Sequence, residues 1–223
     1  MQPNPKDLDK GDAMISNDFT KAMHFRHACK LFDEKKKIPE ETMHYILEAG
    51  RTSPSSFGME PWKFLVVQNE ELKTKLRPLC WNQPQITTCS HLVVILAAIE
   101  SVRPQSGIPQ SRFARRPLPQ EKIDAYINLY GNFLSDTFSS DEKTFCWTAR
   151  QTYIALANMM TAAAFEQIDS CPVEGFEKEN VEKLLAIDTA RYQVAVLVTF
   201  GYRVNPQNEQ LRLSFEEVVA FLD

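Results

Sequence analysis

The chain has 223 residues, which is long enough for one large domain or two small ones with a substantial buried core. Its formal net charge of −4 and its isoelectric point near 5.7 provide no overall attraction to nucleic acid, and no nucleic-acid-binding motif is present. We therefore expect a globular protein that does not bind nucleic acid.

Cysteine usage and apolar stretches indicate the cellular setting. The five cysteines lie scattered without a CxxC pair and no signal peptide is recognisable, which predicts free thiols and a cytoplasmic protein. The longest uncharged apolar-leaning stretch, residues 151–165, is too short and too polar to cross a membrane, so we expect no membrane partner. The four histidines share no metal-ligand spacing, which predicts that there is no metal site.

The N-terminal region divides into two parts. Residues 1–15 are polar and contain proline and glycine, so we predict a flexible N-terminus before a single domain over residues 16–223. From Ser16, apolar residues at roughly helical spacing predict a helix that ends near Phe25 or Arg26.

Helical and strand patterns then follow one another. Pro39 and the two glutamates after it predict the first turn of a second helix, which we expect to stop at Gly50. Asn69 predicts the cap of a third helix. Three short apolar, β-branched runs predict buried strands. These strands cover residues 62–67, 92–99 and 194–202, and two longer helices are predicted over residues 121–138 and 145–165.

Two of these segments bear on the architecture. The segment 145–165 is apolar or small almost all round, so the helix must be enclosed by a core or by a subunit interface. Residues 103–119, with four prolines and four arginines, predict a long loop, and such loops are usually functional or mobile. Helices intermixed with at least three strands predict an α+β or α/β single domain.

Several common site motifs are absent from the sequence. There is no GxGxxG, no GxxxxGK[ST] and no GxSxG, which excludes a dinucleotide fingerprint, a P-loop and a serine hydrolase elbow. Only seven glycines are present. A phosphate would therefore have to be held by side chains and helix ends.

The stretch FRHACK, residues 25–30, is the first candidate site. In an extended chain Arg26 and Lys30 face the same way, roughly 13 Å apart at about 3.3 Å per residue, whereas His27 faces the other way. A guanidinium suits a phosphate and an ammonium suits a point of negative charge, so the pair could hold a ligand with a phosphate at one end. By composition alone the stretch is more typical of a solvated strand edge than of a binding site.

Further segments carry polar groups in the same chain. TSPSSFGMEPWKF, residues 52–64, offers two serine hydroxyls in a proline-stiffened turn. SCPVEGF, residues 170–176, predicts a link that presents backbone N–H groups with a glycine for close approach. QLRLSFEEVV, near the C-terminus, supplies a second guanidinium from Arg212.

Five motifs in this order and spacing carry a resemblance to a known family. RHACKLF, SPSSFGMEPWKF, the Asn82-Gln83 pair of WNQPQI, PVEGF and LRLSFEEVV resemble the FMN-dependent, oxygen-insensitive NAD(P)H nitroreductase family over about residues 19–220. The resemblance implies an α+β fold in which helices flank a mixed sheet. It also implies a homodimer with FMN at the subunit interface.

The resemblance assigns site residues position by position. Arg26 and Arg212 would contact the FMN phosphate, Lys30 would lie at the pyrimidine edge, and the Glu174 segment would approach N5. No side chain is expected to act as the catalytic group, because the flavin N5 carries the hydride and the protein tunes it. The residues expected to bind the cofactor are Arg26, His27, Ala28, Lys30, Pro54, Ser55, Ser56, Asn82, Val173, Glu174, Gly175 and Arg212, with Pro54, Ser55 and Ser56 donated by the other subunit.

The implied activity is NAD(P)H-dependent reduction of nitroaromatics, quinones or similar planar acceptors by a ping-pong, two-electron mechanism. A flavin or pteridine reductase, or a non-catalytic flavin-binding redox sensor, are the alternatives. The choice between NADH and NADPH and the physiological acceptor stay open at this stage.

Some positions depart from the family pattern. Gly58 and Glu60 stand where many members have Asn and Gln, and Gln85 and Gln210 stand where some carry lysines. Phe133 aligns with an aromatic that gates the substrate pocket, although a core position is an equal alternative and Tyr126, Tyr130 or Phe138 could replace it. Cys29 and Cys171 lie beside expected flavin contacts, and we expect them to be buried as small apolar groups without redox chemistry.

Overall fold

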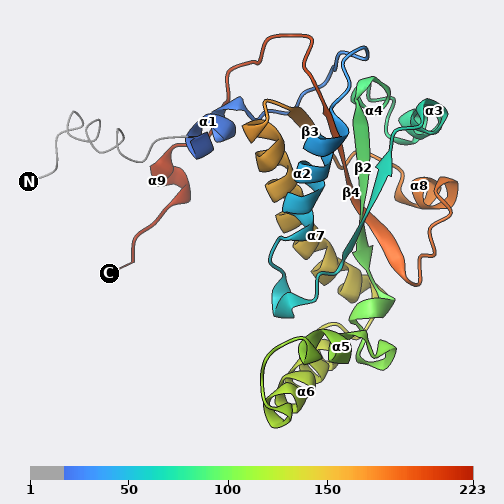
Figure 1. Cartoon of the computed structure of the whole chain (residues 1–223), viewed down its shortest axis with the longest axis vertical. Helices are drawn as coiled ribbons and strands as arrows, with labels where there is room; N and C mark the ends of the chain where they lie inside the picture. Colours follow the sequence, from blue (N-terminus) through green and yellow to red (C-terminus); the bar gives the residue numbers. More distant parts are fainter. Residues whose placement is uncertain (1–17, 223) are drawn as a thin grey trace, which may run out of the picture.

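A four-stranded sheet forms the centre of the computed structural model, which describes residues 18–222 (Figure 1). The strands lie in the order β1-β2-β4-β3 and each neighbouring pair is antiparallel. Their bounds are β1 Trp62–Val67, β2 His91–Ala98, β3 Asp169–Val173 and β4 Tyr192–Gly201. The expected flexible segment 1–15 lies outside the described residues.

The helices cover both faces of this sheet. Helices α2 and α7 pack on one face, while α3, α4 and α8 pack on the other (Figure 1). The bounds are α1 Asp18–Phe25, α2 Glu40–Arg51, α3 Glu70–Leu79, α4 Gln85–Thr88, α5 Ile108–Ala114, α6 Gln120–Thr137, α7 Asp141–Phe165, α8 Lys178–Leu184 and α9 Phe215–Val218. The predicted α+β class is confirmed, and the parallel pairing within residues 18–222 is the single bridge between Ala28 and Ser170.

Strand β2 is apolar along its whole length because the sheet has a core on each face. Leu92, Val94 and Leu96 enter the core under α3 and α8, whereas Val93 and Ile95 enter the core under α2 and α7. This confirms the predicted central strand. The prediction of a buried strand is wrong for β1, which is an edge strand with only Val67 fully buried.

Two further predictions need correction. The segment 103–119 is not a continuous loop, because α5 forms within it with Pro109 in its first turn, where the missing N–H costs no hydrogen bond. The segment SCPVEGF, residues 170–176, is not only a link, because its first four residues belong to the edge strand β3.

Helix α7 begins four residues earlier than predicted because the Ser140 side chain caps it by accepting a hydrogen bond from the Lys143 backbone N–H. Its enclosure is incomplete in the single chain. Tyr153, Ile154 and Phe165 are each more than one third exposed along one side of the helix. This exposed α7 stripe therefore lacks a partner within residues 18–222.

The C-terminal segment after β4 runs away from the sheet, and α9 projects from the body of the molecule (Figure 1). Its apolar side chains are largely exposed. They are Leu211, Leu213, Phe215, Val218, Phe221 and Leu222. Across residues 18–222 no helix combines the length and the hydrophobicity needed to cross a membrane.

Gly50 does not stop α2 as predicted, since the helix continues to Arg51. A Cβ atom at Gly50 would lie 2.8 Å from Cγ of Met159, so the absent side chain lets α2 approach α7 closely. The glycine is therefore a packing residue of the helix pair.

This contact predicts opposite effects for two helical glycines. Gly50→Ala should lower the free energy of unfolding by about 1–3 kcal/mol, because the added methyl overpacks against Met159. Gly131→Ala in α6 is the matched control, since a Cβ there meets nothing within 4 Å, and helix propensity should raise stability by about 0.5–1 kcal/mol. Urea unfolding of both variants measures the difference. Equal effects of the two substitutions would contradict the packing role.

Candidate functional site

Backbone pairing places the FRHACK stretch beside β3. Ala28 forms a parallel bridge with Ser170, and the Cys29 N–H donates to the Ser170 carbonyl at 3.1 Å. This register carries Lys30 to the next residue of the strand, where its Nζ lies 3.3 Å from Sγ of Cys171. Two segments separated by more than 140 residues in the chain are thereby joined.

A third segment reaches the same place after α3. The side-chain amide of Gln83 donates to the Gly175 carbonyl at 2.9 Å, and that of Gln85 donates to Oε1 of Gln83 at 2.8 Å. Gln85 is fully buried, and its Nε2 lies 3.8 Å from the Cys171 sulfur. The structure therefore brings together the Lys30, Gly175 and Gln83 segments, as the resemblance implies.

The turn that carries Asn82 is held in an unusual backbone conformation. Trp81 and Asn82 have φ values of 54° and 55°, in the left-handed region that costs energy for residues other than glycine. The Asn82 N–H donates to the Arg77 carbonyl, and the Asn82 side chain is exposed. This turn brings the indole of Trp81 against Gly175.

Trp81 is a residue that the sequence reasoning did not select. A Cβ atom at Gly175 would lie 2.5 Å from the Trp81 ring, and the indole remains 69% exposed. An exposed aromatic face next to the Glu174-Gly175 backbone can stack on a flat molecule. Its place beside the predicted Asn82 was the signal that could have found it.

Glu174 lies on the surface and accepts a hydrogen bond from the Tyr153 hydroxyl of α7. Burial and the nearby Glu174 carboxylate raise the pKa of Tyr153, so the hydroxyl keeps its proton and donates. Val173 is buried at the end of β3, which leaves its backbone as the part that can face a ligand.

His27 belongs to a polar cluster with Asp169 and Arg203. Its Nδ1 lies 3.6 Å from Oδ1 of Asp169, a buried carboxylate that also pairs with Arg203 at 2.6 Å. The guanidinium of Arg203 stacks on the Phe25 ring, 4.2 Å from its centroid. His27 therefore has a structural partner on the side away from Lys30.

Arg26 and Arg212 differ in their surroundings. The Nε of Arg26 is buried and has no hydrogen-bond partner within residues 18–222. Arg212 lies in the exposed C-terminal segment, where its Nη1 donates to the Leu211 carbonyl, and in the described chain it makes no hydrogen bond or ion pair with the other expected ligands. One chain therefore does not assemble both guanidinium groups.

The neutral Gln210 has a structural role. Its amide donates to the carbonyls of Met23 and His24 at 3.1 and 3.0 Å and also contacts the Arg26 carbonyl. These carbonyls lie at or just beyond the C-terminal end of α1, where donors are needed. Gln210 thus fixes the backbone just before Arg26.

The loop that carries Pro54, Ser55 and Ser56 lies against another face of α7. The Ser56 N–H donates to Oε1 of Gln151 at 2.8 Å. Gln151 and Tyr153 are two residues apart on α7, which places them about 200° apart around the helix. The loop is therefore not brought to Glu174 and Lys30 in the same chain.

The arginines of residues 112–116 hold this loop. Arg112 donates to the Met59 carbonyl, Arg116 donates to the Phe57 carbonyl at 2.9 Å, and Arg115 pairs with Glu60 at 3.0 Å. The charges of these arginines are used in loop contacts, and Arg115 gives the Glu60 carboxylate a counter-ion.

Phe133 packs in an aromatic cluster, with ring centroids 5.2 Å from Phe57 and Phe138 and 5.8 Å from Trp147. Its surroundings are those of a half-buried core residue beneath the loop. The gating role stays a prediction.

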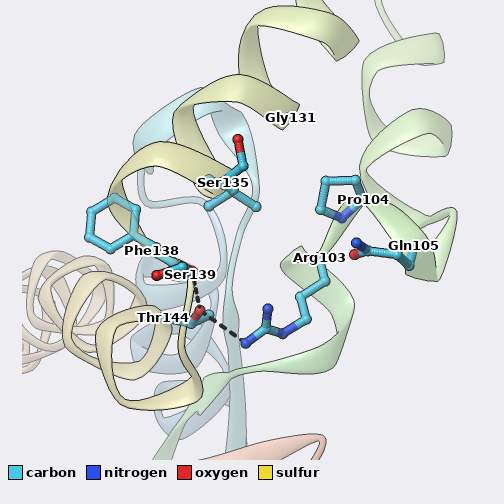
Figure 2. A pocket seen from close by; sticks show the side chains of 9 residues that line it. Arg103, Pro104, Gln105, Gly131, Ser135, Phe138, Ser139 and Thr144 are labelled. Atoms are coloured by element: carbon cyan, nitrogen blue, oxygen red, sulfur yellow. Dashed lines mark hydrogen bonds between the residues drawn. The ribbon is translucent and has the colours of Figure 1, made fainter.

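Two of the cavities in the described part of the chain differ in their relation to the expected ligands. One, of about 140 Å³, is lined by residues 27–31 together with Asn205, Pro206 and Asn208. The other, of about 260 Å³, lies between α6, the start of α7 and the turn at Pro104 (Figure 2). In that second cavity Arg103 bonds to Thr144 and Asp141, and none of the expected flavin ligands lines it.

Comparison with known proteins decides the family. The family model described as "Nitroreductase family" matches residues 23–202. The chain belongs to the nitroreductase family. This is a family of oxidoreductases, so the chain is an enzyme of that class.

Curated relatives are similar in sequence to this nitroreductase over nearly its whole length. It is 41% identical over 208 residues to "Putative NAD(P)H nitroreductase SH0546" of Staphylococcus haemolyticus, covering 90% of this chain and 95% of that protein. It is 39% identical over 211 residues to "Putative NAD(P)H nitroreductase YfkO" of Bacillus subtilis, covering 90% of this chain and 96% of the other.

Solved structures share the fold. A nitroreductase of Exiguobacterium sibiricum crystallised in complex with FMN superposes with a TM-score of 0.79 at 24% identity, covering 92% of this chain and 98% of that one. A nitroreductase-like protein of Streptococcus mutans gives a TM-score of 0.83 at 18% identity, covering 93% and 99%.

The thiols of this nitroreductase follow the expectation of burial. Cys29 and Cys171 are buried, and burial raises the pKa of Cys29 to about 11 and also raises that of Cys171. All five cysteines are free, and Cys146 is the exposed one.

This burial predicts a thiol-reactivity pattern. Near neutral pH a small disulfide reagent should modify Cys146 quickly, because the thiolate is the reactive form and the other thiols are buried. All five should react after unfolding. Cys146→Ser is the control and should leave no fast-reacting thiol in the folded protein. Fast modification of that variant would contradict the buried environment of Cys29 and Cys171.

Proposed function

We propose that this nitroreductase is an FMN-dependent NAD(P)H oxidoreductase that reduces flat acceptors such as nitroaromatics and quinones. The observation that carries the proposal is the junction of Lys30, Gln83 and Gly175 at one end of the sheet, each from a segment expected to contact the flavin. The names of the relatives support the nicotinamide as the reductant.

The free groups at this junction fit an anionic, planar ligand. Arg26 has a buried Nε without a partner in the described part of the chain, and Lys30 has no carboxylate within ion-pair distance there. The cavity beside residues 27–31 is lined by Lys30, and Arg26 directly precedes its first lining residue in the chain. A phosphate near Arg26 and an electron-rich ring edge near Lys30 would satisfy these groups.

When bound, FMN would supply hydride acceptance and donation at N5, in two steps that use the same open site in turn. The chain provides position and charge. Lys30 would supply a positive charge to the ring edge that becomes more electron-rich on reduction, and Glu174, held by Tyr153, belongs to the backbone segment that would face N5. Trp81 offers an aromatic face for a flat nicotinamide or acceptor.

A homodimer would complete the site. The exposed α7 stripe and the exposed apolar side chains of the C-terminal segment provide surface for a second copy. The loop at Ser55 and Ser56 lies on the far side of α7 from Glu174, so a two-fold partner can bring its own loop to the Lys30 junction. Arg212 could reach a partner's site in the same way.

The first test is whether the purified protein is yellow and whether NADH or NADPH bleaches it without oxygen. We expect bound FMN and loss of its long-wavelength absorbance with at least one of the two reductants. A flavin that stays oxidised with both would instead favour a flavin-binding sensor. A colourless protein that FMN cannot reconstitute would refute the proposal. If free flavins or pteridines are reduced faster than quinones, the flavin or pteridine reductase alternative holds.

Two substitutions separate the roles of the cations. Arg26→Ala should raise the dissociation constant of FMN by about tenfold or more, because it removes a charged partner of the phosphate. Lys30→Ala should mainly lower the flavin reduction potential, because it removes positive charge near the ring. Fluorescence titration and redox titration measure the two effects. Unchanged affinity and potential in both variants would refute the placement of residues 26–30.

Deletion of residues 211–223 tests the dimer. The deletion removes apolar side chains that one chain leaves exposed but keeps Gln210 on α1, so each subunit should stay folded. We expect a shift toward monomer in analytical ultracentrifugation and loss of bound FMN. A deleted protein that remains a dimer with full FMN content would contradict the role of this segment.

A further inference from the structure

The Lys30 side chain has an unusual hydrogen-bond partner. Within residues 18–222 its ammonium makes a single hydrogen bond, to the sulfur of Cys171 at 3.3 Å, and no carboxylate lies within ion-pair distance. Most of the other hydrogen bonds of lysine ammonium groups in this structure go to carboxylates, for example Lys37 to Glu70 and Lys21 to Asp18. At this junction the ammonium is held by an uncharged group.

Cys171 is well suited to hold a charge in place. It is fully buried in β3, opposite Thr199, whose hydroxyl donates to the Cys171 carbonyl at 3.2 Å. Its S–H lies 3.4 Å from the Pro172 carbonyl, which leaves the sulfur free to accept from Lys30. The thiol therefore donates to one carbonyl and accepts from the Lys30 ammonium, with the Gln85 amide as a second, longer donor to the sulfur.

The thiol remains neutral at this site. Burial raises the pKa of Cys171, and this outweighs the opposing effects of Lys30 and Gln85. A neutral acceptor positions the ammonium without cancelling its charge. A carboxylate at the same place would form an ion pair and reduce the positive potential available to a ligand.

The neighbouring amides are uncharged as well. Gln85 approaches the same sulfur at 3.8 Å and donates to Gln83, which donates to the Gly175 carbonyl. A lysine at position 85 would place a second ammonium near the Cys171 sulfur that Lys30 contacts. The glutamine links Cys171 to the Gly175 backbone and adds no charge.

We propose that Cys171 is a positioning residue that fixes the Lys30 ammonium at the flavin ring edge as an unneutralised charge, and so raises the flavin reduction potential. The proposal rests on the proposed function, because it assumes that Lys30 faces the flavin. It assigns Cys171 no redox chemistry of its own.

A double-mutant cycle on the FMN-loaded protein tests this role. The four proteins are wild type, Cys171→Ala, Lys30→Met and the double variant. In Cys171→Ala the ratio of reduced-FMN to oxidised-FMN affinity should fall by about fivefold, which corresponds to one lost hydrogen bond. In the Lys30→Met background the same substitution should change the ratio by less than about twofold.

Two further variants separate positioning from packing. Cys171→Ser keeps a hydrogen-bond acceptor and should retain the wild-type ratio. Cys89→Ala is the matched control, because Cys89 is an equally buried thiol whose sulfur donates to the Ile86 carbonyl, while the nearby Lys73 ammonium bonds to its backbone carbonyl, which the substitution keeps. It should leave the flavin potential unchanged, although it can lower thermal stability. Thermal melts of all variants report folding independently of the flavin.

The outcomes are distinguishable. Equal effects of Cys171→Ala with and without Lys30, or an effect of Cys171→Ser as large as that of Cys171→Ala, would overturn the positioning role. If Lys30→Met shifts the potential while Cys171→Ala does not, this inference fails and the proposed function stands. If Lys30→Met itself leaves the potential unchanged, the placement of Lys30 fails and the inference fails with it.

Discussion

The parallel bridge between Ala28 and Ser170 is the constraint on which the candidate site depends. It adds the FRHACK stretch to the open edge of β3 and satisfies backbone groups that an edge strand would otherwise expose. The stretch is also fixed further along, where Phe32 bridges Arg203 and packs where a side chain at Gly201 would lie. Lys30 therefore reaches Cys171 from a rigid sheet edge.

The distribution of charge around the β3 edge of the sheet also supports a site at this place. Asp169 is the buried carboxylate nearest to the stretch, and it is matched by Arg203 and approached by His27. On the other side, neutral amides at Gln85 and Gln210 satisfy backbone and side-chain groups. Arg26 and Lys30, which the resemblance places on an anionic cofactor, form no ion pair with a carboxylate within residues 18–222. The positive potential at this edge therefore comes mainly from these two side chains.

The sequence predicts those strands in which every residue lies in the same kind of surroundings. Strands β2 and β4 were predictable because both faces of the sheet are covered, which requires continuous apolar residues. Strand β3 was not, because five residues that include Asp169, Ser170 and Pro172 carry no such pattern. Helix α5 lies in a segment whose four prolines and four arginines predicted a long loop, although proline is tolerated in the first turn of a helix.

The order of the motifs in the sequence predicted which segments form the site, but it did not predict every residue that makes a contact there. The register of five motifs placed Lys30, Gly175 and the Asn82-Gln83 pair in one site, and the structure joins their segments. Trp81 and Tyr153 were missed because their contacts depend on a left-handed turn and on the phase of a helix. Helix phase also explains why one chain does not bring the loop of Pro54, Ser55 and Ser56 to the other expected ligands. Because α7 separates the Ser56 loop from Glu174, a two-fold partner is the simplest arrangement that would unite them.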